Sequence, residues 1–286
     1  MDYAQQEKQR FVYLFIPIPF IFYWYTCLPS IGLGDSAMMV EQIKHLRLST
    51  HVNTHNITIL LGWLLHFLPL GDLAYRLNLV SVISGALCVS IFYLALYQIH
   101  RCWITAVITS LFLMLSHSLW WSTSCKQEHA TNALFISLSL FLYGRLQKSN
   151  NPRYFYILFF LSGLAFFHHF ELGCLVGGVS IALLWRFLFN KKYIWSTLWR
   201  CSLCFFIGFL PYFLLFIHDA VISHSFNATL SGALGGQFKK LYFQGGFWYG
   251  ITNYLFLIFF QTPSAYLLTI ILGPFFFFKS WRISES

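Results

Sequence analysis

Acidic and histidine side chains gather on one side of the membrane when the apolar segments of this sequence are threaded through a bilayer. Ten of the 11 histidines fall on that side. Six of the nine acidic residues fall there too: Asp35, Glu41, Asp72, Glu128, Glu171 and Asp219. Carboxylates and imidazoles accept and donate protons, and carboxylates also bind divalent cations. Because a charge in or near hydrocarbon costs about 3 kcal/mol unless function or pairing compensates, this clustering predicts an active face.

The apolar segments identify an integral membrane protein. Hydrophobic residues make up 58% of the chain, aromatic residues 21% and charged residues only 9%, which lies outside the range of soluble proteins. Helices are the structure by which such segments satisfy their backbone in lipid. We therefore expect an all-α, polytopic membrane protein with about nine transmembrane helices. Their expected positions are residues 11–28, 79–99, 103–119, 131–144, 154–170, 172–190, 201–217, 247–260 and 264–278.

Basic residues set the expected orientation, because short cytoplasmic loops carry an excess of Lys and Arg. Placing the N-terminus in the cytoplasm puts ten of the 18 basic residues in inner segments. This assignment depends on residues 57–70, which are apolar but shorter than the roughly 20 residues that a span needs. We expect them to form an interfacial or re-entrant helix. If they spanned, the basic groups at 145–153 and 186–200 would move outside.

The net charge of +9 does not indicate nucleic-acid binding. Basic residues lie mostly in short inner loops, where anionic lipid headgroups attract them, and no basic stripe with exposed aromatic residues appears. We expect the lipid bilayer as a partner and no nucleic acid. Residues 1–286 are expected to form a single integral membrane domain with no separate soluble domain. We place this multi-pass protein in a bacterial cytoplasmic membrane rather than in the endoplasmic reticulum.

The first outer loop, residues 29–56, is the main polar segment of the chain. Met39, Ile43 and Leu46 recur in it at helical spacing, so we expect an amphipathic helix that lies along the membrane surface. Asp35 directly precedes this pattern. An aspartate there can cap the helix by accepting a backbone N–H, or it can serve an active site, and the two roles are compatible. Asp219, much later in the chain, is expected to cap a helix end.

Short motifs in the first half of the chain resemble those of a known family. In order and spacing they are similar to a family of multi-spanning membrane proteins, first catalogued with unknown function, whose animal member is an endoplasmic-reticulum protein O-mannosyltransferase. The resemblance covers residues 31–175. The motifs are Gly34-Asp35-Ser36, His51, Gly62, Leu68-Pro69, Arg76-Leu77-Asn78-Leu79-Val80-Ser81, Trp120 or Trp121, Gln127-Glu128, Gly163-Leu164 and His168-His169.

The resemblance implies a GT-C glycosyltransferase. Such an enzyme has a helical membrane domain, a catalytic acid in its first non-cytoplasmic loop and a polyprenyl-phosphate sugar donor. The implied activity is that of a hexosyltransferase, such as an O-mannosyltransferase, with a protein or a glycan as the acceptor. By position, Asp35 and Glu128 match acidic residues of the family, and His51 and His169 match its histidines.

The sequence departs from the family's motifs at three places, one of which is the absence of the tyrosine near the family's second acid. Ala37-Met38 follow Ser36 where the family has Gly-Glu, and residues 52–56 replace its Pro-Pro-Gly-Tyr-Pro. A catalytically inactive relative is therefore one alternative. A transporter or lipid flippase is another, because many spans and few charges also suit one. We also expect this chain to lack the soluble C-terminal region of larger members.

Sugar transfer to a hydroxyl group requires a carboxylate that takes the acceptor's proton as the anomeric carbon becomes oxocarbenium-like. Asp35 is the expected base. Glu128 is the second expected catalytic residue, although it could instead form a surface pair with Lys126 or His129. A divalent cation, Mg or Mn, is the one cofactor considered, and Asp35 and Glu128 would hold it. The departing phosphate needs positive charge and hydrogen bonds. The residues expected to supply them are Arg47, His51, Arg76, Lys126 and His169.

Overall fold

The structure, a computed structural model, describes residues 15, 17–30, 36–51, 54–124, 129–149, 151–188 and 194–233. Within these ranges every regular element is a helix, which confirms the all-α prediction for the described part of the chain. The helices are α2 (Pro17–Tyr25), α3 (Ser36–Lys44), α4 (Asn56–His66), α5 (Leu73–His100), α6 (Trp103–Leu115), α7 (His117–Ser124), α8 (His129–Ser149), α9 (Arg153–His168), α10 (Phe170–Leu188), α11 (Ile194–Ile222) and α12 (Phe226–Ala233).

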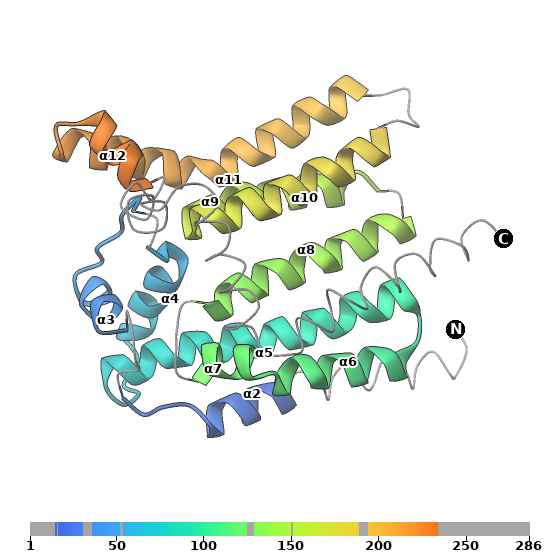
Figure 1. The fold of residues 1–286 in the computed structure, drawn as a ribbon, viewed down its shortest axis with the longest axis horizontal. Coiled ribbons are helices and arrows are strands. Elements are labelled where there is room, and N and C mark those ends of the chain that lie inside the picture. Colours follow the sequence, from blue (N-terminus) through green and yellow to red (C-terminus); the bar gives the residue numbers. More distant parts are fainter. Residues whose placement is uncertain are drawn as a thin grey trace, which may run out of the picture. The chain divides into compact units, whose positions relative to one another are not determined.

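Residues Met1–Leu115 and Leu119–Gly235 cluster into one compact unit, in which the long helices form a bundle (Figure 1). Helices α8 to α11 run side by side and alternate in direction. One end of the bundle, which we call the α4 end, contains α3 and α4, the start of α8 and the ends of α9 and α11. The opposite end contains the end of α5, which Arg101 follows, and the start of α9, whose first residue is Arg153. These basic residues thus lie away from the predicted active face.

Two of the described helices are long and apolar enough to cross a membrane: α5, and residues Trp195–Ile222 of α11. Helices α6 and α7 pass the same test together but are bent by 57°, so the described residues hold up to three such spans. Helix α4, α9 and residues Leu172–Leu184 are apolar but shorter. The runs predicted between residues 79 and 217 each overlap a described helix, but the run at 103–119 is divided between α6 and α7. The predicted spans at 247–260 and 264–278 lie outside the described residues.

Helices α9 and α11 approach each other through two glycines. A Cβ atom at Gly163 would collide with the backbone carbonyl oxygen of Phe205, and one at Gly208 would collide with that of Phe160. Membrane helices place small residues at such interfaces because they let the two backbones touch. The contact fixes α9 relative to α11, and the ends of both helices carry side chains of the candidate site.

Helices α3 and α4 pack on α5 through a small apolar core. Met39 and Ile43 of α3 meet Ile59 of α4 and Leu77 of α5, and each of these side chains is at most 2% exposed. This confirms the predicted amphipathic helix for Met39 and Ile43. Leu46 lies beyond the helix instead. It has a φ of 46° and its N–H donates to the Ile43 carbonyl at 3.1 Å, so it belongs to the turn that ends α3.

Candidate functional site

Three of the predicted site residues, Asp35, Lys126 and Glu128, lie outside the described residues. Helix α3 begins directly after Asp35, and α8 begins directly after Glu128. The structure therefore describes the elements that follow both predicted catalytic acids. The catalytic roles themselves stay predictions, as does a divalent cation between the two carboxylates.

The chain segments that lead toward the two predicted acids are bonded to each other. The N–H of Leu28 donates to the carbonyl of Ser124, the last residue of α7, at 3.1 Å. The side chain of Asn78 on α5 donates to the carbonyls of Leu28 and Ser30 at 2.7 and 3.0 Å. Asn78 therefore anchors the last described residues before the loop that carries Asp35.

The carboxylate of Asp219 on α11 holds the loop that precedes α4. Its Oδ2 accepts hydrogen bonds from the backbone N–H and from the hydroxyl of Thr50, both at 2.9 Å. Its Oδ1 lies 3.4 Å from Nδ1 of the neighbouring His218. The sequence predicts a helix cap at Asp219, whereas the carboxylate joins α11 to a distant loop. No local pattern indicates such a contact.

Asn56, the first residue of α4, joins the same loop to the end of α9. The residue is 2% exposed. Its Nδ2 donates to the carbonyls of Ser49 and Phe167, both at 2.9 Å, while its Oδ1 accepts the N–H of Ser49 at 3.2 Å. The start of α4 is thereby held against the residue that precedes His168.

Four histidines meet beside Asn56: His55 before α4, His129 at the start of α8, His168 at the end of α9, and His169 directly after it. We call them the histidine cluster. Between ring centroids, His55 lies 4.8 Å from His169, 5.4 Å from His168 and 6.1 Å from His129. Of these four histidines, the sequence predicts a site role for His169 alone. The other three rings join it only because α4, α8 and α9 meet at one end of the bundle.

The histidine cluster extends from the surface into the interior. His129 is exposed and His169 is partly buried, whereas His55 is 5% and His168 is 0% exposed. His168 stacks on Phe135 of α8, with their centroids 5.9 Å apart. Neither ring nitrogen of His168 has a hydrogen-bond partner. Buried polar atoms without such a bond are uncommon, and they often mark a functional site.

A chain of hydroxyl groups lies next to the histidine cluster. The hydroxyl of Thr131 on α8 lies 3.1 Å from that of Thr58 on α4 and 3.3 Å from that of Ser84 on α5. All three side chains are buried. Because buried polar groups need partners, these bonds specify how the three helices meet close to His55 and His129.

The remaining predicted phosphate-binding residues have different surroundings. Arg76 on α5 donates from its guanidinium group to three backbone carbonyls within residues 66–71, at 2.5 to 2.9 Å. It therefore ties down the connection between α4 and α5. Arg47 and His51 are exposed on the loop before α4. The backbone N–H of His51 donates to the Ser49 hydroxyl at 3.1 Å.

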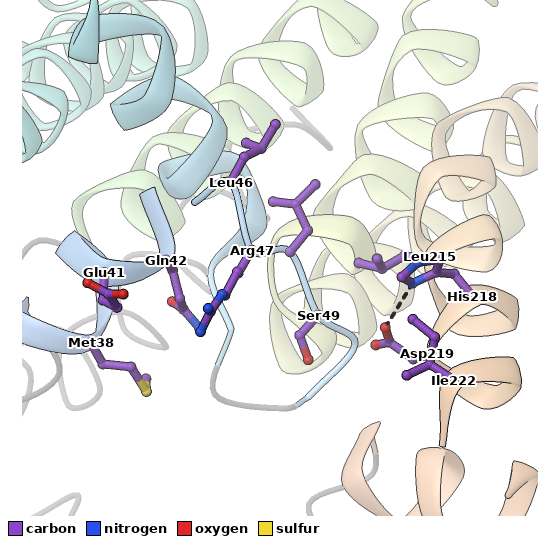
Figure 2. Close-up of a pocket in the computed structure, with 11 residues that line it drawn as sticks. Met38, Glu41, Gln42, Leu46, Arg47, Ser49, Leu215, His218, Asp219 and Ile222 are labelled. Carbon is purple, nitrogen blue, oxygen red and sulfur yellow. Dashed lines mark hydrogen bonds and ion pairs between the residues drawn. The ribbon is translucent and has the colours of Figure 1, made fainter. Parts of the chain in front are cut away.

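A groove of about 990 Å³ lies between α3 with its following loop on one side and α11 on the other (Figure 2). Its lining is mainly apolar, with Leu215 among the contributing residues of α11. Glu41 and Arg47 reach it from the α3 side, and His218 and Asp219 from α11. The groove thus adjoins the Thr50–Asp219 contact and offers both charge and apolar surface.

The histidine cluster is not arranged as a metal centre. Among the described residues, no group of three or more His, Cys, Asp or Glu side chains could hold a metal ion. The rings of His55 and His169 are stacked, with an angle of 14° between their planes. Metal-binding imidazoles must instead direct their nitrogens at a common point.

More than half of the chain is similar to a known protein family. Residues 47–194 match the model of a family described as the protein O-mannosyl-transferase TMEM260 N-terminal domain. The mouse protein O-mannosyl-transferase TMEM260 is 23% identical over 221 residues, which cover 74% of this chain and 31% of the mouse protein. The chain therefore spans about a third of the length of that relative. No solved structure matches the chain. The family match contains all four members of the histidine cluster but neither Asp35 nor Asp219.

Proposed function

This chain belongs to the protein O-mannosyl-transferase TMEM260 N-terminal domain family, and from that membership we propose that it is a membrane glycosyltransferase. The proposed reaction moves a sugar from a polyprenyl-phosphate donor to a hydroxyl group of a protein or glycan on the non-cytoplasmic face. One structural observation supports the proposal in addition to the family match. Polar groups held by hydrogen bonds gather at the α4 end of an apolar helical bundle, where Asp219, Asn56 and the histidine cluster converge.

We place the α4 end on the non-cytoplasmic side and the N-terminus in the cytoplasm. The location of Arg101 and Arg153 at the opposite end of the bundle supports this orientation, because cytoplasmic loops carry the excess of basic residues. A GT-C architecture with nine transmembrane helices belongs to the same proposal. The two described helices that are long and apolar enough to cross a membrane, α5 and residues Trp195–Ile222 of α11, support it.

The proposed chemistry uses Asp35 as the general base. As the acceptor oxygen bonds to the anomeric carbon, its proton passes to the Asp35 carboxylate. The bond between the anomeric carbon and the phosphate oxygen breaks, and polyprenyl phosphate leaves with the bonding electrons. Glu128 would stabilise the developing charge, alone or through a divalent cation. The cationic and polar groups proposed for the phosphate are those of Arg47, His51, Arg76, Lys126 and His169.

The direct test is transfer of radiolabelled mannose from polyprenyl-phosphate mannose to acceptor peptides or glycans by the purified protein. Removal of a general base typically costs about 100-fold or more in rate. We therefore expect the Asp35→Asn variant to lose at least about 100-fold of the native transfer rate. Native transfer by this variant would refute the assigned base.

Asp72→Asn is the matched control. Asp72 caps α5 by accepting the N–H of Tyr75 at 2.7 Å, and asparagine caps a helix about as well as aspartate. We expect this variant to transfer mannose at the native rate. An equal loss in both variants would attribute the effect to the removal of surface charge. Binding of polyprenyl phosphate by the native chain without transfer would support the inactive-relative alternative.

A further inference from the structure

We propose that the histidine cluster binds a phosphate monoester and takes up a proton as it does so. The proposal rests on the proposed function, because the group that leaves a polyprenyl-phosphate sugar donor is a phosphate monoester. The cluster consists of His55, His129, His168 and His169, which three segments bring together: the start of α4, the start of α8 and the end of α9.

The chemistry of closely packed imidazoles favours an anion of this kind. A neutral imidazole has one N–H donor, and a protonated one has two. Rings whose centroids lie 4.8 to 6.1 Å apart repel one another when several are charged, and a bound anion lowers that repulsion. A phosphate monoester carries up to two negative charges, and its second pKa of about 6 lies where histidine titrates.

The members of the histidine cluster differ in solvent exposure, so they would play different roles in binding. His129 and His169 form its accessible edge, so they would contact the phosphate oxygens. His55 and His168 lie behind that edge, and both are almost completely buried. The two ring nitrogens of His168 are free of hydrogen bonds, so this neutral ring can still donate one hydrogen bond and accept another. Because complete burial disfavours the charged form of His168, the added proton stays on the accessible edge of the cluster.

The surroundings of His168 supply further imidazoles. Among the described residues, the titratable groups that face it are His55 from the α4 side, His129 from α8, and His169. Phe135 of α8 covers it with an apolar ring. Glu128 and Glu171 flank the cluster in the sequence, and their side chains are not among those that the structure describes. A bound dianion would give the described imidazoles a compensating charge.

Proton uptake determines the direction of the pH effect. When binding adds one proton to the complex, affinity rises by up to about tenfold for each unit that the pH falls through the histidine range. We expect a phosphate monoester to bind at least about tenfold more tightly at pH 6 than at pH 8.

The experiment measures binding to the full chain in phosphatidylcholine nanodiscs at both pH values. Farnesyl phosphate is the lipid probe, inorganic phosphate is the free probe, and farnesol is the control for apolar binding. Tighter binding of farnesyl phosphate identifies a lipid-borne phosphate as the ligand, while equal binding of the two phosphates identifies the phosphate group alone. Farnesol binding as tight as that of farnesyl phosphate, or equal affinity at pH 6 and pH 8, would overturn the proposal.

Variants of single histidines test whether the phosphate binds at the histidine cluster. His129→Gln changes an exposed side chain and leaves the buried core intact, so we expect it to fold and to weaken phosphate binding about tenfold. His168→Phe keeps a ring against Phe135 but removes both nitrogens, so we expect weaker phosphate binding with an unchanged pH dependence. His100→Gln, at the opposite end of the bundle, is the control and should bind as the native chain does. Native binding by His129→Gln would assign the phosphate to another site.

The outcomes separate this inference from the proposed function. If no donor supports sugar transfer but the cluster binds farnesyl phosphate with the expected pH dependence, the proposed function fails and the site stands. If mannose is transferred but the His129→Gln and His168→Phe variants bind phosphate as the native chain does, the function stands and the site fails.

Discussion

Asp219 accepts two hydrogen bonds from Thr50, a residue 169 positions earlier in the chain. One donor is the backbone N–H and the other is the hydroxyl, so the carboxylate fixes both the path of the loop and the side chain. The loop leads through His51 to His55 and the histidine cluster. The C-terminal end of α11 therefore positions the loop that leads into α4.

We expect Asp219→Ala to release this loop. Loss of two hydrogen bonds to a charged acceptor should destabilise the protein by about 2 kcal/mol. Thermal unfolding in detergent measures the loss of stability, and hydrogen exchange measures the protection of the Thr50 N–H. His218→Ala is the control, because it changes the adjacent exposed side chain and leaves the carboxylate in place. An unchanged exchange rate at Thr50 in Asp219→Ala would contradict the assigned contact.

The glycine contact between α9 and α11 makes a second prediction. Gly163→Ala places a methyl group against the backbone of Phe205, and a backbone cannot move aside as a flexible side chain can. We expect a loss of about 1 to 3 kcal/mol in stability, seen as a lower melting temperature or a lower yield of folded protein.

Gly178→Ala provides the matched control for Gly163→Ala. Gly178 lies within α10, and a Cβ atom there would meet nothing within 4 Å. Alanine is favoured over glycine in a helix interior, so this variant should be as stable as the native chain or more stable by about 0.5 kcal/mol. Equal effects of the two substitutions would rule out a close backbone contact at Gly163.

The helices could be predicted from the sequence because long apolar segments have few other structures in lipid. The pattern of Met39 and Ile43 likewise predicted the buried face of α3, since amphipathic spacing is a local property. Leu46 shows the limit of that argument. It continues the spacing, but the backbone turns before it, and periodicity does not report where a helix ends.

The candidate site could be predicted only in part. His169 stands in a motif, whereas His55 and His129 become neighbours through contacts between helices that are far apart in the sequence. His168 and His169 are adjacent in the sequence but differ in burial, because the ring of His168 is buried and that of His169 is partly exposed. Which ring faces the interior depends on packing against Phe135. The roles of Asp35 and Glu128 remain predictions from the sequence.

Asn56 offers a test of how the site is held together. Asn56→Asp keeps the size of the side chain but replaces the Nδ2 donor by an oxygen that faces the carbonyls of Ser49 and Phe167. We expect this buried substitution to destabilise the protein by about 3 kcal/mol, measured by thermal unfolding.

Asn151→Asp is the control for Asn56→Asp. The Oδ1 atom of Asn151 accepts the N–H of Arg153 at 3.0 Å, and a carboxylate can accept it equally well. We expect this variant to melt at the native temperature. If Asn56→Asp also melted at the native temperature, the proposed hydrogen bonds of Asn56 to both carbonyls would be wrong.

Arg76→Lys tests whether Arg76 acts through its geometry or only through its charge. The guanidinium group reaches three carbonyls within residues 66–71, and a lysine ammonium on its flexible stem cannot reproduce that fork. We expect Arg76→Lys to lower stability by about 1 to 2 kcal/mol and to increase proteolysis within residues 66–71. Arg153→Lys, an exposed substitution at the opposite end of the bundle, should have no effect on either measurement. If Arg76→Lys left stability and proteolysis unchanged but weakened binding of farnesyl phosphate, Arg76 would belong to the substrate site, as the sequence predicts. Loss of stability with native phosphate binding would instead establish that it positions the connection between α4 and α5.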